Sequence, residues 1–85
     1  MQFQGAVVKE QGVTFAVLIV QRFVLDSTTE IAKAIAFGTT TFGDIPIVVM
    51  SQDARGVPTY KGRRDIVDFL AKLDLDQIPW ATYAI

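Results

Sequence analysis

The residues best suited to bind a ligand in this chain are four cations, Arg55, Lys61, Arg63 and Arg64, with Gly62 among them. They immediately precede a predicted helix. The free amides and the positive dipole end of such a helix would meet two guanidinium groups, an arrangement that favours phosphate or carboxylate. We therefore predict that Arg55, Lys61, Gly62, Arg63 and Arg64 form a binding site for a small anion.

The same cations have a second interpretation, a solvated rim with no ligand. Positive charge at a helix N-terminus is unfavourable by about 0.3 to 1 kcal/mol. Asp65 and Asp68 follow in the predicted helix and can offset that cost through pairing. The sequence alone leaves both interpretations open.

Composition excludes much of enzyme chemistry. With no cysteine and no histidine, thiol catalysis, imidazole general base catalysis, the common serine triad and the usual zinc sites are impossible. Asp74 and Asp76 flank Leu75, but the other ligands and the glycine of a calcium loop are missing. We therefore predict no catalytic residue, no metal site and no cofactor.

Charge and hydropathy narrow the partners. The net charge is −1 and the pI is near 5.1, which argues against general electrostatic binding to nucleic acid or to an anionic membrane. The longest apolar run, within residues 13–20, is far shorter than the roughly 20 residues of a spanning helix. The first residues show no secretory signal pattern, so the expected location is cytoplasmic.

The chain is organised around Val13 to Val20, in which only Thr14 is polar. Its β-branched and aromatic residues predict a central strand that is apolar on both faces. Residues 3–10 predict a preceding strand, joined to it by a turn at Gln11 and Gly12 to form an antiparallel hairpin.

A helix is predicted after this hairpin. Ser27 and Glu30 match a capping box, residues 31, 34 and 35 form an apolar stripe, and Gly38 is a suitable left-handed end. Residues 39–44 are then expected to be a loop.

The second half predicts a strand, a turn, a strand and a helix. Residues 45–50 form a strand parallel to the central one, and residues 53–56 form a turn that ends in Gly56. Residues 57–60 return antiparallel, with Pro58 confining them to a sheet edge or to the first strand position. Ile66, Phe69, Leu70 and Leu73 then have the spacing of an amphipathic helix.

Together these elements predict a single α+β domain over residues 1–85. The expected architecture is a two-layer sandwich in ββαββα order, with a four- or five-stranded mixed sheet and two helices on one face. Residues 75–85 are expected to be an extended arm or an edge strand, with Trp80, Tyr83 and Ile85 docked on the body.

Residues 45–73 resemble the closing ββα unit of thioredoxin and glutaredoxin-like domains. The resemblance is carried by Ile45-Pro46 leading into a strand, a turn ending in Gly56, a second strand, and the amphipathic helix that follows Gly62. It implies a cis-proline at Pro46. Because the family's paired cysteines are absent, it also implies a redox-inactive, binding-type relative.

The hydrophobic content of 51% is more than one small core easily hides, and it favours self-association. We predict a non-catalytic interaction module, a homodimer or the binder of another protein. The predicted interface residues are Leu18, Val20, Val48, Trp80 and Tyr83. The alternative is an anion or small-molecule binding domain that uses the basic start of the second helix.

Overall fold

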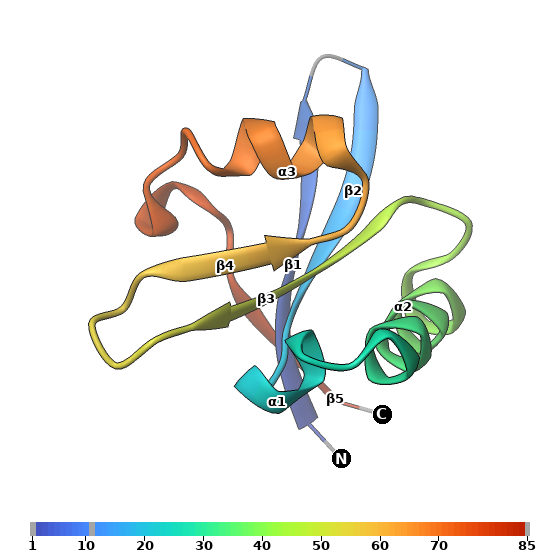
Figure 1. The fold of residues 1–85 in the computed structure, drawn as a ribbon. Coiled ribbons are helices and arrows are strands. Elements are labelled where there is room, and N and C mark those ends of the chain that lie inside the picture. The colour runs from blue at the N-terminus through green and yellow to red at the C-terminus, as the bar shows by residue number, and fades with distance from the viewer. Residues whose placement is uncertain (1, 11, 85) are drawn as a thin grey trace.

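The computed structural model describes residues 2–10 and 12–84 and contains a five-stranded mixed sheet (Figure 1). In space the strands run β4-β3-β2-β1-β5, and β2 and β3 are parallel while the other neighbouring pairs are antiparallel. The predicted central strand is the middle one, as expected. The strands are β1 (Gln2–Glu10), β2 (Val13–Ile19), β3 (Ile47–Gln52), β4 (Pro58–Lys61) and β5 (Ala81–Ala84).

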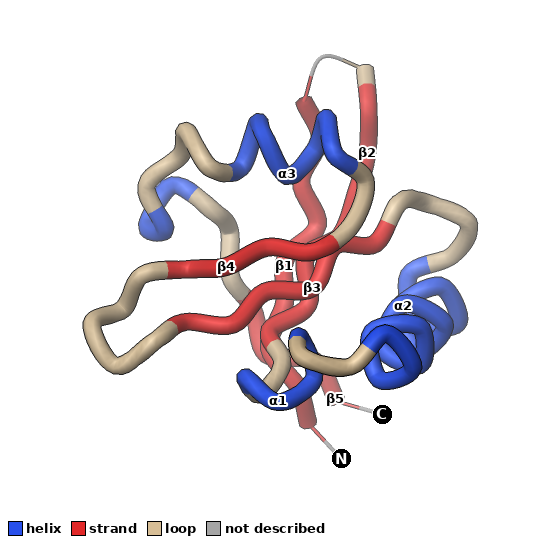
Figure 2. Tube along the Cα trace, in the orientation of Figure 1, coloured by secondary structure: helices blue, strands red, loops and turns tan. Residues whose placement is uncertain are grey.

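Three α-helices and a 3₁₀ turn accompany the sheet (Figure 2). They are α1 (Arg22–Leu25), α2 (Thr28–Phe42), α3 (Arg64–Leu70) and η1 (Leu75–Gln77). Their order along the chain extends the predicted ββαββα pattern by α1, η1 and β5. Helix α1 was not predicted, because it is only four residues long and no apolar spacing marks so short a helix in the sequence.

The two predicted helices lie on opposite faces of the sheet, so their predicted placement in one layer is wrong. Successive strand residues point to alternate faces, and the buried residues divide accordingly into two clusters, with α2 and α3 on opposite sides of β3 (Figure 1). The α3-side core contains Ala6, Phe15, Val17, Val48, Met50, Tyr60, Ile66, Leu70 and Ile78, and the α2-side core contains Ala16, Leu18, Leu25, Ile47 and Val49. Each face of the central strand is thus covered by a helix of the same chain.

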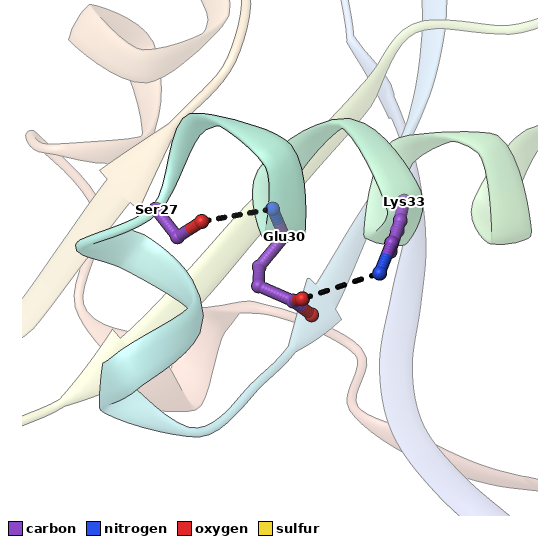
Figure 3. Close-up of polar contacts among 3 residues, drawn as sticks. All are labelled: Ser27, Glu30 and Lys33. Carbon is purple, nitrogen blue, oxygen red and sulfur yellow. Dashed lines mark hydrogen bonds and ion pairs between the residues drawn. The ribbon is translucent and has the colours of Figure 1, made fainter.

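The predicted N-terminal cap of α2 forms in part. The Ser27 hydroxyl accepts a hydrogen bond from the Glu30 amide at 3.2 Å, as expected. The Glu30 carboxylate accepts instead from the Lys33 ammonium at 3.4 Å, on the exposed side of the helix (Figure 3). The cap residue and the first turn of α2 are therefore as predicted. The second hydrogen bond of a full capping box is replaced by the ion pair between Glu30 and Lys33.

The predicted end of α2 at Gly38 is wrong, and residues 39–42 are helical rather than a loop. Gly38 is buried inside the helix, where a Cβ would lie 2.7 Å from the Ile47 Cγ2 methyl. This glycine therefore serves close packing of the helix on β3 rather than helix termination. The helix ends at Gly43, whose φ of 95° suits glycine.

The predicted C-terminal arm is an edge strand that runs antiparallel to β1. Trp80 packs against the α3-side core and donates from Nε1 to the Leu75 carbonyl at 2.9 Å. Tyr83 stacks on Phe3 with ring centroids 5.2 Å apart. Both aromatic residues dock as expected, whereas Ile85, like Gln11 of the first turn, lies outside the described residues.

The ββα unit at residues 45–73 also forms, with β4 at the sheet edge and Pro58 as its first residue. The peptide bond before Pro46 is trans, in contrast to the cis bond implied by the thioredoxin resemblance. In the described part of the chain, no helix is long and apolar enough to cross a membrane.

Candidate functional site

The predicted anion-binding residues are divided between the two ends of β4. Lys61 is the last residue of β4, Arg63 is the N-cap of α3, and Arg64 is the first residue of that helix. Arg55 lies in the β3–β4 turn, beyond the other end of the strand, and its amide donates to Asp53 Oδ1 at 2.8 Å. An extended segment advances about 3.3 Å per residue, so β4 separates Arg55 from the other three cations.

Gly62 has a structural role at this place. A Cβ on Gly62 would lie 3.0 Å from a Val48 methyl and 3.2 Å from the Ile47 carbonyl oxygen, and its φ is 156°. Glycine therefore lets the chain pass close to β3 as it turns from β4 into α3. Close packing therefore accounts for the glycine at this position, and no bound ligand is needed to explain it.

Arg63 is already paired with an anion of the chain itself. Its Nε donates to Asp65 Oδ1 at 2.7 Å and a terminal nitrogen donates to Oδ2 at 2.8 Å. The hydrogen bond and charge of Arg63 lower the pKa of Asp65. This two-point pair is the solvated arrangement that the second interpretation of the cations describes. Lys61 and Arg64 then remain as the exposed cations beside it.

The predicted interface residues are largely occupied by the chain itself. Leu18 is 3% exposed and Val48 is fully buried, so neither is accessible to a second copy. Val20 is half-buried against the α2-side core. Trp80 and Tyr83 are half-buried on opposite faces of the sheet. The chain's own helices α2 and α3 therefore cover the sheet at Leu18 and Val48, while Val20, Trp80 and Tyr83 keep part of their surface exposed.

A groove of about 650 Å³ lies on the α3 side of the sheet and is here called the Tyr60 groove. Its hairpin wall consists of residues 55–58 and Tyr60, and its helix wall consists of residues 70–71 and 73–76. The β3–β4 turn and the segment that joins α3 to η1 supply these walls, and both segments lie on the left side of the molecule in Figure 1. The groove therefore belongs to two loops held in place by one hairpin and one helix.

Local hydrogen bonds fix the hairpin wall. The Asp53 carbonyl accepts from the Gly56 amide at 2.9 Å, which confirms the predicted turn, and Asp53 Oδ1 accepts from the Val57 amide at 3.0 Å. Gln52 Nε2 also donates to the Gly56 carbonyl at 3.1 Å. This network presents Val57 to solvent with 55% of its surface exposed.

The lining of the Tyr60 groove combines apolar and polar surface in comparable amounts. Val57, Pro58, Leu73 and Leu75 contribute apolar side chains beside the buried Leu70, while Tyr60 and three charged residues contribute the polar groups. Apolar side chains around placed polar groups are typical of binding sites.

One polar group in this lining lacks a partner. The Tyr60 hydroxyl is buried and makes no hydrogen bond with any residue in the ranges 2–10 and 12–84, and burial raises the pKa of this phenol. A buried hydroxyl without a partner costs about 1 to 3 kcal/mol, so the site tolerates a loss that an apolar phenylalanine would avoid.

The charges of the groove are segregated by wall. Arg55 stands on the hairpin wall, whereas Asp74 and Asp76 stand on the helix wall. None of the three forms an ion pair with a residue in the described ranges 2–10 and 12–84. The arrangement can accept a surface with apolar groups at its centre and opposite charges at its sides.

The groove itself was not predicted. Arg55 was assigned to the anion-binding cations, and Asp74 and Asp76 were considered only as acids that lack the other ligands of a calcium loop. The available signal was the alternation of Leu73 and Leu75 with these acids directly after an amphipathic helix. Only the fold shows that this segment lies against the β3–β4 turn.

Across residues 2–10 and 12–84, no three metal-ligating side chains gather into a possible ion site. Comparison of the chain with protein families, with curated proteins and with solved structures gives no match. The groove itself is therefore the basis for a functional proposal.

Proposed function

We propose that this protein is a non-catalytic interaction module that binds a protein segment in the Tyr60 groove. The observation that carries the proposal is the groove itself, about 650 Å³ in volume and lined by both apolar and charged side chains, with a buried hydroxyl in one wall that has no partner among residues 2–10 and 12–84. A protein segment is favoured over nucleic acid because the net charge is −1 and the groove carries two acids against one base.

Further support comes from composition. Cysteine and histidine are absent, which removes the common nucleophiles and bases, and lack of cysteine suits the cytoplasmic location that the proposal retains. The anion-binding alternative has less support, since Arg55 stands apart from the other cations and Arg63 is paired with Asp65.

Selection from a displayed library of random peptides tests the proposal. Peptides that bind the chain should lose at least about tenfold in affinity for Val57→Glu, because the charge replaces an exposed apolar wall. The matched control is Phe23→Glu on α1: Phe23 is 59% exposed and lies outside the groove lining. Fluorescence polarisation with labelled peptides measures the affinity of each variant. Equal affinity for the Val57 variant and the unmodified chain would refute the proposed site.

A further inference from the structure

The Tyr60 groove has a property that a groove of uniform charge lacks: its two walls are complementary to each other. Arg55 lies on the hairpin wall, and Asp74 and Asp76 lie on the helix wall. If a second copy docks face to face with its two-fold axis parallel to the groove, each hairpin wall faces the partner's helix wall. Arg55 of each copy then approaches acids of the other, and this happens twice by symmetry.

The apolar surface has the same complementarity. Val57, next to Pro58 in the hairpin wall, exposes 55% of its surface. In the same two-fold arrangement it meets Leu73 and Leu75 on the partner's helix wall. These leucines are half-buried and retain apolar surface for contact. The β3–β4 turn also projects from the body at the end of the hairpin, so a partner can reach it (Figure 2).

We infer that the groove is occupied by a second copy of this chain, which forms a two-fold dimer with Arg55 of each protomer against Asp76 of the other. The inference rests on the proposed function and names the partner. It also moves self-association away from the sheet faces, which α2 and α3 already cover. Because the contact is confined to one groove on each protomer, we expect the dimer to be weak and its population to depend on protein concentration.

Charge reversal tests the inference through a pattern that a general loss of stability cannot imitate. Arg55→Glu and Asp76→Arg are each expected to weaken self-association at least about tenfold, because two symmetry-related attractions become repulsions. An equimolar mixture of the two variants should associate again, since both contacts in the mixed dimer join opposite charges. The double variant Arg55→Glu/Asp76→Arg should also associate with itself.

Sedimentation equilibrium up to roughly 1 mM protein, the range of weak complexes, measures each species, and amide spectra confirm that each variant is folded. Arg22→Glu, an exposed arginine on α1, is the matched control and should leave association unchanged. An unmodified chain that stays monomeric, or a mixture that does not associate, overturns the inference. Peptide binding that depends on Val57 would survive that result, so the two proposals fail separately.

Discussion

Tyr60 shows at the scale of one residue how this fold departs from the most stable choice. Its ring belongs to the α3-side core, opposite Met50 in the β3–β4 register, and only 8% of the residue is exposed. Phenylalanine would fill that space without a buried hydroxyl. The tyrosine therefore costs stability in the isolated chain, a cost that is typical of residues selected for binding rather than for folding.

Tyr60→Phe is expected to raise the free energy of unfolding by up to about 1 kcal/mol, because it removes a buried polar group that has no hydrogen bond. Urea denaturation at neutral pH, followed by the fluorescence of Trp80, measures the change. Tyr83→Phe is the control and should stay within about 0.5 kcal/mol of the unmodified chain. A loss of more than about 1 kcal/mol in the Tyr60 variant would mean that the hydroxyl has a partner in solution.

The same phenol gives the protein a dependence on alkaline pH. Burial raises the pKa of Tyr60 above its ordinary value, near 10 in an unfolded chain. As pH rises past that value, the unfolded chain loses this proton while the folded chain retains it, so stability falls. Tyr60→Phe should therefore show a smaller decrease in the free energy of unfolding between about pH 9 and pH 11. Parallel decreases in the two proteins would contradict this origin.

Short-range contacts explain which of the predicted site residues lie together in the fold. Residues 61–64 stay together because they are consecutive in the chain. The predicted pairing of these cations with nearby acids also forms, between Arg63 and Asp65, which are two residues apart. Arg55 was grouped with them by proximity in sequence, and an intervening strand separates it. Asp74 and Asp76, which line the same groove as Arg55, are about 20 residues away in the chain, a separation at which sequence spacing does not predict a shared site.

At the scale of elements, Gly38 explains the main error in secondary structure. A glycine after an apolar stripe is typical of a helix end, and from sequence this explanation cannot be distinguished from close packing in a helix interior. The packing explanation requires a neighbour, Ile47 of β3, that no local pattern identifies. Ser27 was predicted correctly because its partner, the Glu30 amide, is three residues away.

Gly38→Ala distinguishes the two explanations by the sign of its effect. Helix propensity alone predicts a gain of about 1 kcal/mol, but the added methyl would lie 2.7 Å from Ile47 Cγ2 and 3.0 Å from Leu18 Cδ1. Overpacking of this kind costs about 1 to 3 kcal/mol, so we expect net destabilisation in thermal and urea unfolding. Ala36→Gly on the exposed side of α2 is the control and should lose about 1 kcal/mol from propensity alone. A stabilised Gly38 variant would show that α2 does not pack closely on β3.

At the scale of the whole molecule, the two apolar faces of the sheet are covered in a different way from the one predicted. A central strand apolar on both faces requires cover on both sides, and this expectation is met. Both helices were predicted on one face, whereas α2 occupies one face and α3 the other. The side of the sheet on which a helix packs depends on the path of its connections, and residue periodicity does not record that path.

Val48 and Val49 test this two-sided cover, since they are consecutive, fully buried and on opposite faces of β3. If the chain's own helices cover both faces, Val48→Ala and Val49→Ala should each lower the free energy of unfolding by about 1.5 to 3 kcal/mol, the cost of two lost methyl groups and the cavity they leave. The measurement is urea denaturation in an Arg55→Glu background, where self-association through the groove is suppressed and only intrachain packing remains. A sheet with one open face would instead give a large loss for one valine and less than about 0.5 kcal/mol for its neighbour. Similar losses in this background would place both cores within a single chain.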